Sequence, residues 1–252
     1  MTKPAGKHWL LYPNPIVDRG FLRGFARGLV EGSTLIANCG RGSPTAMRAL
    51  LVGFWPFVYE FEKAIDAQSK RLPLRRLLKG RFSTEIAQQY FVSAAHVLRQ
   101  MHEEEGEHAR TWHDDASKMG LNLTTLGVAR ERVHCIQALI DKAYTDDPFK
   151  FFCALAATEY IAEELSAFLC GSRPFTEQLD GQFAWGELHI AHHDGPSHLE
   201  IDEDLARAVH PSEDSIVVAE DMKRETKAVE LLFSQAAEEV LERARVDALD
   251  IT

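Results

Sequence analysis

Apolar residues recur at helical spacing along most of the chain, whereas runs that alternate with the period of a β-strand are nearly absent. This pattern predicts an all-α protein. Seven or eight helices joined by short loops are typical of a single helical bundle. The expected helices lie at about 16–32, from 44 onward, 83–119, 126–144, 147–170, 174–194, 197–209 and 213–246.

Capping signals place several of the expected helix ends. Ser43 and Pro44 supply an N-cap and a first-turn proline, and Ser83 opens a long helical segment that stops at Gly120. The stretch IANCGRGSP, residues 36–44, is expected to be a loop. The chain is therefore expected to run as long helices separated by short connections.

Length and charge narrow the class of protein. A chain of 252 residues suits one well-buried domain over residues 1–252, in which residues 1–14 are expected to form an N-terminal tail. With 38 acidic against 28 basic residues the net charge is -10, and no basic cluster is long enough to bind nucleic acid. A small-molecule substrate is therefore expected, and a homodimer is left open.

Membrane insertion, secretion and cysteine-based metal sites are not expected. The longest apolar run, Ala49 to Tyr59, is too short to span a bilayer, and the N-terminal segment lacks a signal-peptide pattern. These features predict a cytoplasmic protein. No CxxC spacing occurs, which argues against a zinc knuckle or a disulfide framework. The chain has four cysteines: Cys39, Cys135, Cys153 and Cys170.

Glutamate and histidine fall on the apolar faces of several separate helices. Glu105 and His108 are i,i+3 neighbours, so both can reach one metal ion from one helix face. Glu60 and Glu62 interrupt the apolar run FWPFVYEFEKAI, and Glu159 interrupts FFCALAATEYIA. An unpaired buried carboxylate is costly, so each needs a metal, a proton or a cation. The pattern leaves the choice between Glu60 and Glu62 open.

The segment WGELHIAHHDGPSHLEID adds a cluster of histidines. His189 and His193 lie one helical turn apart and share a face, whereas Asp194 and His198 flank the break at Gly195-Pro196. His189 and His193 are the safer pair of ligands, with His198 or Asp194 completing the set. The alternative to metal binding for any one of these residues is a solvated or hydrogen-bonded side chain without a ligand.

Carboxylates and imidazoles from several helices are the ligands that Fe2+ accepts, and zinc or manganese fits the same donors. The candidate metal ligands share these donor types and lie in four segments of the chain. They are Glu60, Glu105, His108, Glu159, His189, His193, Asp194 and His198.

The stretch EEEGEHARTWHDDASKMGL resembles the corresponding helix of the heme-oxygenase-like diiron oxidases of the TenA/PqqC-like superfamily. In that family a Glu, a metal-binding His and a Trp four residues later precede a helix end at Met-Gly. The order of the other parts is also similar, with a Glu on an FWPFV-like helix, a Glu on an ALAATEY-like helix and a late His after an aromatic residue. The matching residues are Glu105, His108, Trp112, Met119-Gly120, Glu60, Glu159, Trp185 and His189.

This resemblance implies an enzyme with a heme-oxygenase-like fold, two Fe2+ ions per chain and O2 as oxidant. The implied reactions are desaturation, oxidative C–C cleavage or N-oxygenation of a small amino-acid-like or fatty-acid-like substrate. In the family the late helix reads His, three residues, Asp, two residues, His. Counting from His189 instead places His193 and Pro196 there, which is a departure at the second iron site.

Other functions of this fold remain as alternatives. Thiaminase-II-like hydrolases share it and use an active-site Cys, and cofactorless oxidases share it without a metal. A ferritin-like carboxylate bundle would need its Glu and ExxH segments in another order. Heme oxygenase places its proximal His on the first helix, whereas the one early histidine here is His8. A non-enzymatic helical binding protein would leave the Glu and His pattern unexplained.

Overall fold

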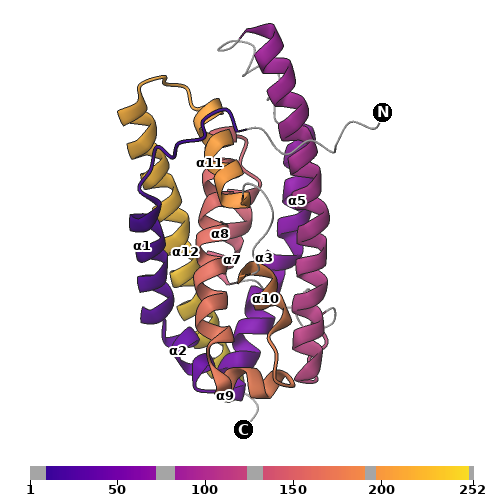
Figure 1. Ribbon diagram of the computed structural model, residues 1–252. Helices are drawn as coiled ribbons and strands as arrows, with labels where there is room; N and C mark the ends of the chain where they lie inside the picture. Colours follow the sequence, from indigo (N-terminus) through magenta and orange to yellow (C-terminus); the bar gives the residue numbers. More distant parts are fainter. Residues whose placement is uncertain (1–9, 72–82, 124–132, 191–196, 250–252) are drawn as a thin grey trace.

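The protein is a bundle of α-helices in a computed structural model that describes residues 10–71, 83–123, 133–190 and 197–249 (Figure 1). No strand occurs in these ranges, so the all-α prediction is confirmed. Within them no helix is both long and apolar enough to cross a membrane. The helices are α1 Arg19–Gly32, α2 Thr34–Gly40, α3 Pro44–Arg71, α5 Thr84–Lys118, α7 His134–Ala143, α8 Pro148–Cys170, α9 Arg173–Thr176, α10 Ala184–Ile190, α11 His198–Val209 and α12 Ser215–Leu249, with a 3-10 turn, η1, at Glu177–Leu179.

Side-chain caps set the ends of the helices that carry candidate ligands. The Ser83 hydroxyl accepts from the backbone N–H of Ile86 at the start of α5, and Asp147 caps α8 ahead of Pro148. At α11, Ser197 and Glu200 form a reciprocal capping box. Each cap satisfies backbone N–H groups that have no partner inside the helix. The start of α11 is therefore fixed by the Ser197 cap.

Two of the expected elements differ from the observed ones. Much of the expected loop 36–44 is helical, because the Ser33 side chain caps a new short helix, α2. The expected helix 174–194 is broken, since Asp180 and Gly181 adopt left-handed backbone conformations with φ of 57° and 89°. Such angles end a helix. Of the expected helix 126–144, residues 126–132 lie outside the described residues, and the rest is observed as α7.

Helix α8 runs through the centre of the bundle and is packed by α1, α7, α10, α11 and α12 (Figure 1). Its sequence is apolar on nearly every side, as expected for a helix that meets neighbours all round. Any polar side chain on α8 that points inward therefore lies among several helices at once. Glu159, near the middle of α8, has this position.

Gly106 of α5 lies against the side chain of Glu62 on α3. A Cβ atom at this position would lie 3.3 Å from Cδ of Glu62, tighter than ordinary contacts between side chains. The glycine thus leaves room for the Glu62 carboxylate beside α5, next to Glu105.

Glu230 on α12 is a buried carboxyl group with no hydrogen-bond partner for either oxygen among the described residues. Burial raises its pKa from 4.5 to about 8, and Lys227 offsets only part of this. Between these pH values the folded state binds more protons than the unfolded chain. The free energy of unfolding is therefore expected to fall as the pH rises from about 4.5 to about 8.

The variant Glu230→Gln tests this expectation, because it keeps the shape of the side chain and removes its titration. We expect it to lose most of this pH dependence and to gain on the order of a few kcal/mol of unfolding free energy at pH 8. Urea denaturation of both proteins at pH 5 and pH 8 measures the difference. An equal pH dependence in the two proteins would contradict the assignment.

Candidate metal centre

Three helices bring Glu105, Glu159 and His198 to one point. Each residue offers one ligand atom, and these atoms all lie within 4.8 Å of one another. Glu105 comes from α5, Glu159 from α8 and His198 from the first turn of α11. Residues separated by up to 93 positions in the chain thus converge, as the sequence pattern predicted for a metal site.

His108 lies one turn along α5 from Glu105, with its Nδ1 atom 3.2 Å from Glu105 Oε2. This Nδ1 is buried and makes no aligned hydrogen bond. Burial lowers the pKa of His108, but the carboxylates of Glu105 and Glu159 outweigh burial, and the pKa is raised above 6.5. The two carboxylates therefore favour the protonated, positively charged ring of His108.

His198 lies between two carboxylates. Its Nε2 is 2.8 Å from Glu104 Oε2, and its Nδ1 is 3.5 Å from Glu159 Oε1. Burial opposes the charged ring, yet the two glutamates raise the pKa of His198 to about 11. The same contact lowers the pKa of Glu159 although burial acts in the opposite direction. Protonated His198 therefore provides the positive charge that neutralises the carboxylates of Glu104 and Glu159.

His189 on α10 is fixed by its own helix. Its Nδ1 donates to the carbonyl of Trp185 at 2.8 Å, so Nε2 carries the lone pair. The ring lies against Trp185 and against His108, with ring-centroid distances of 3.9 and 4.4 Å. Burial, and then the charge of His108, lower the pKa of His189. A neutral imidazole that is oriented in this way is suited to binding a metal.

Asp202 is a further candidate that the sequence reasoning missed. It is fully buried on α11, one turn beyond His198, and neither of its carboxylate oxygens has a hydrogen-bond partner among the described residues. Burial raises its pKa well above 3.8, and the charges of Glu159 and Glu105 add to this while His198 opposes it. The pattern His, three residues, Asp, two residues, His could have identified it. When the count begins at His198, the Asp of this pattern falls on Asp202 and its second His falls on Leu205.

A hydrogen-bonded pair behind the site joins the helices that carry Glu159 and Asp202. The next residues along each helix are Tyr160 and Glu203, and the Tyr160 hydroxyl donates to Glu203 Oε1 at 2.9 Å. Arg19 of α1 donates to the other oxygen of Glu203 at 2.6 Å. Tyr160 and Glu203 therefore tie α8 to α11, and Arg19 adds α1 to the contact.

The structure does not bring Glu60 into the cluster. Its carboxylate accepts from the Tyr144 hydroxyl at 3.1 Å and lies 3.8 Å from Lys63 Nζ. The face of α3 that points to the site carries Phe57 and Phe61 instead, so Glu60 is rotated away. Glu62, the alternative, lies against α5 with Oε1 3.6 Å from Nδ1 of His102. Neither glutamate is placed as a ligand here.

Five of the predicted ligands thus lie together: Glu105, His108, Glu159, His189 and His198. His193 and Asp194 were predicted as ligands too, but both lie outside the described residues. Their contribution stays a prediction.

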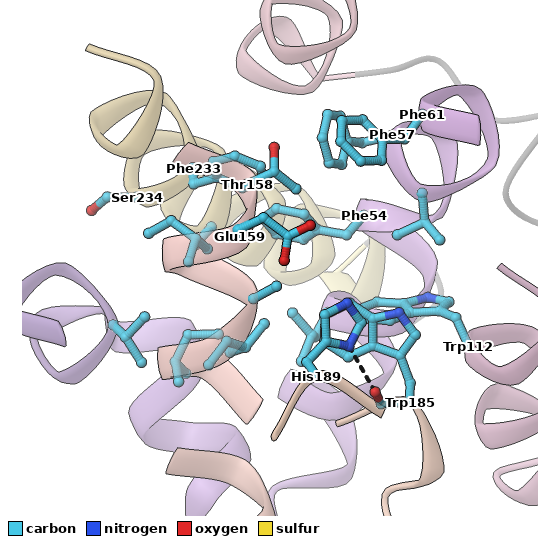
Figure 2. Close-up of a pocket in the computed structure, with 18 of the residues that line it drawn as sticks. Phe54, Phe57, Phe61, Trp112, Thr158, Glu159, Trp185, His189, Phe233 and Ser234 are labelled. Carbon is cyan, nitrogen blue, oxygen red and sulfur yellow. Dashed lines mark hydrogen bonds between the residues drawn. The ribbon is translucent and has the colours of Figure 1, made fainter. Parts of the chain in front are cut away.

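Two cavities reach the site, and Glu159 and His189 line both of them. One is apolar and ends at Glu105, Glu159 and His189, and Figure 2 shows the Glu159 carboxylate between the phenylalanine rings and His189. The other is polar, has a volume of about 430 Å³, and also reaches Glu159 and His189. The candidate site is therefore accessible to a small molecule.

The donor set fits an Fe2+ ion. Glu105 lies beside His108 and Glu159 beside His198, and burial favours the protonated form of Asp202, so protons neutralise these carboxylates in the structure as it stands. A bound cation could replace those protons. Both Asp202 oxygens are buried without hydrogen-bond partners among the described residues, as expected of atoms that could bind a metal. Oxygen and imidazole donors in this mixture are typical of non-heme iron sites.

No cysteine lines either cavity. The four thiols are present as free cysteines, and three of them are buried. Burial raises the pKa of Cys39 to about 12 and that of Cys170 to about 11. A thiol with a raised pKa is a poor nucleophile at neutral pH. The described residues therefore offer no cysteine nucleophile beside the cluster.

Comparison with known proteins shows the fold. No protein-family model matches the chain, and no curated protein matches it in sequence. Among solved structures, a TenA homolog from Pseudomonas syringae pv. tomato strain DC3000 matches with a TM-score of 0.65 at 16% sequence identity. The match covers 94% of this chain and 100% of that one. The chain thus has the helical heme-oxygenase-like fold, which it shares with this TenA homolog.

Proposed function

We propose that the protein is a non-heme iron enzyme that uses O2 to oxidise a small molecule. The observation that carries this proposal is the convergence of Glu105, Glu159 and His198 within 4.8 Å, beside His108 and the Asp202 carboxylate, whose oxygens have no hydrogen-bond partner among the described residues. These donors come from three different helices of a rigid bundle. Such a set is costly to bury unless it binds a cation.

The chain would hold a pair of Fe2+ ions with its own side chains in distinct roles. Glu105, Glu159 and His198 would be the central ligands, and His108, His189 and Asp202 would complete the set. Bound Fe2+ supplies the electrons that activate O2. Glu104 would orient His198 through the 2.8 Å contact, as a carboxylate behind a metal-bound histidine does.

The apolar cavity would exclude water from the reacting centre. Trp112 and Trp185 form one of its walls and pack edge-to-face with ring centroids 4.9 Å apart. Trp185 in turn holds His189. The walls that shape the substrate site would thus also orient a metal ligand.

A hydrolase of the thiaminase-II kind is the second candidate, because a TenA homolog has the same fold. Such hydrolases use an active-site Cys, and neither cavity at the cluster is lined by one. Such hydrolases also use scattered Glu, His and Tyr, so the feature that separates the two candidates is the absence of a cysteine from the described lining of the two cavities. The geometry therefore favours the iron enzyme.

Anaerobic loading with Fe2+ followed by metal analysis tests the proposal. We expect a pair of iron ions to remain bound per chain after gel filtration, and the loaded protein to consume O2 faster than the metal-free protein in the presence of a reductant. The variant His96→Ala, which removes an exposed histidine of α5, should behave like the unaltered protein. Protein that retains only traces of iron would overturn the proposal.

A further inference from the structure

The two cavities at the cluster differ in size and in lining. The apolar cavity has a volume of about 80 Å³, whereas the polar cavity has a volume of about 430 Å³. Glu159 and His189 line both, so each cavity brings its occupant to the same candidate ligands. An enzyme that oxidises an organic molecule with O2 has to admit two reactants of different size and polarity. The two cavities therefore indicate where each reactant binds.

The apolar cavity is too small for a ring and large enough for a diatomic molecule. An engineered apolar cavity of about 150 Å³ holds benzene or xenon, and a single water molecule needs roughly 10–15 Å³. The volume of about 80 Å³ lies between these limits. This cavity therefore suits a very small reactant and excludes most organic substrates.

The walls of the apolar cavity offer few hydrogen bonds to water, because their polar groups already donate within the protein. The Ser33 hydroxyl donates to Glu238 Oε1 at 3.0 Å, and the Thr158 hydroxyl donates to a backbone carbonyl of its own helix at 2.9 Å. The Trp112 indole N–H donates to the carbonyl of Leu51 at 3.0 Å. A buried water molecule needs about two to four polar partners, so water is held poorly along these walls.

We propose that the apolar cavity is the O2 site of the enzyme and that the organic substrate binds in the polar cavity. O2 is apolar, so its transfer from water to apolar walls is favourable. Held in this cavity, O2 would lie beside Glu105, Glu159 and His189, as the end of the cavity in Figure 2 indicates. This inference deepens the proposed function, on which it rests for the use of O2.

The polar cavity is unsuited to O2 and has room for the larger reactant. Its lining carries charges of both signs: Arg27 Nε lies 2.8 Å from Glu164 Oε2, and His198 Nε2 lies 2.8 Å from Glu104 Oε2. Charged walls bind water, so an apolar gas gains little by leaving bulk water for this cavity. Two separate cavities let O2 reach the site while the organic substrate fills the other.

Xenon tests the apolar cavity in metal-free protein, because this apolar gas binds in dry cavities of similar lining. Under xenon pressure, the methyl NMR signals of Ile36, Leu50 and Ile161, which line the cavity, should shift and saturate. The methyl signals of Ile136 and Leu139 on α7, which do not line it, should shift far less. Equal shifts in the two groups of methyls, or no shift in either, would overturn the inference.

The variant Ala162→Val fills part of the apolar cavity from α8. We expect it to lower the affinity for xenon by at least about fivefold. Ala154→Val is the matched control, since Ala154 is a similarly buried alanine of the same helix that lines neither cavity, and it should keep the affinity. Ala237→Val fills the cavity from α12 and replaces Ala162→Val if that variant does not fold. Equal losses in the filling variant and in Ala154→Val would overturn the placement.

O2 uptake by the Fe2+-loaded protein identifies the gas. Ala162→Val should raise the KM for O2 by at least about fivefold and leave the iron content and the rate at saturating O2 unchanged, as expected when binding alone is weakened. Xenon should compete with O2 in the unaltered protein. An unchanged KM for O2 in Ala162→Val would overturn the assignment of O2 to this cavity. Protein that binds xenon but retains only traces of iron would overturn the proposed function and support the cavity as a site for an apolar gas.

Discussion

The variant His198→Ala is expected to lower the affinity of the protein for Fe2+ by at least about 100-fold and to abolish iron-dependent O2 uptake. Loss of an outer partner of a metal ligand already costs about 10–100-fold, and loss of the ligand itself costs more. His198 contacts both Glu104 and Glu159, so its removal also leaves two carboxylates facing each other without a cation. Competition with a fluorescent chelator measures the affinity.

The matched controls separate a ligand from a structural residue. His96→Ala removes an exposed imidazole of α5 and should keep the affinity. Glu104→Gln keeps His198 but weakens its support, and should show an intermediate loss of about 10–100-fold. Circular dichroism should report a helical protein in every case. Full iron occupancy in His198→Ala would exclude His198 as a ligand.

The variant Trp112→Ala is expected to lower the free energy of unfolding by about 3–5 kcal/mol, the usual cost of removing a buried tryptophan. Trp112 is 1% exposed, and its indole N–H donates to the carbonyl of Leu51 at 3.0 Å. Its ring also packs on Trp185, which holds His189. Guanidinium denaturation, monitored by circular dichroism, measures the loss.

Trp112→Phe serves as the control for this experiment. It keeps most of the packing and removes the hydrogen bond, so its cost should be nearer to about 1 kcal/mol. Trp112→Ala should also weaken iron binding, because it removes the ring on which Trp185 packs, and Trp185 in turn orients His189. A change below about 1 kcal/mol in Trp112→Ala would show that this wall contributes little to the core.

Much of the fold could be predicted because long amphipathic periods identify long helices. The expected helix 147–170 is observed as α8 and the expected 197–209 as α11, each shifted by a single residue at its start. Short elements escaped prediction, since one turn of helix carries too little periodicity to be distinguished from a loop. The α2 helix depends on the Ser33 cap, and the break at Asp180 depends on a backbone angle that no apolar pattern encodes.

The candidate site could be predicted where the spacing of two residues on one helix is enough to show that their side chains share a face. Glu105 and His108 share a face because they are i,i+3 neighbours, and the structure places them together. Glu60 and Glu62 could not be resolved, because the rotation of α3 is set by which of its aromatic residues pack inward. Asp202 was missed because the count began at His189 on α10 and not at His198, which lies on a separate helix.

The hydrogen bond between Tyr160 and Glu203 has a consequence for the candidate metal ligands on the same two helices. Because Glu159 and Asp202 are the preceding residues, a hydrogen bond between their successors locks the rotational phase of α8 against that of α11. Arg19 ties this lock to a third helix. The candidate ligands would thus be preorganised by a neighbouring contact, and little of the free energy of metal binding would be spent on arranging the backbone.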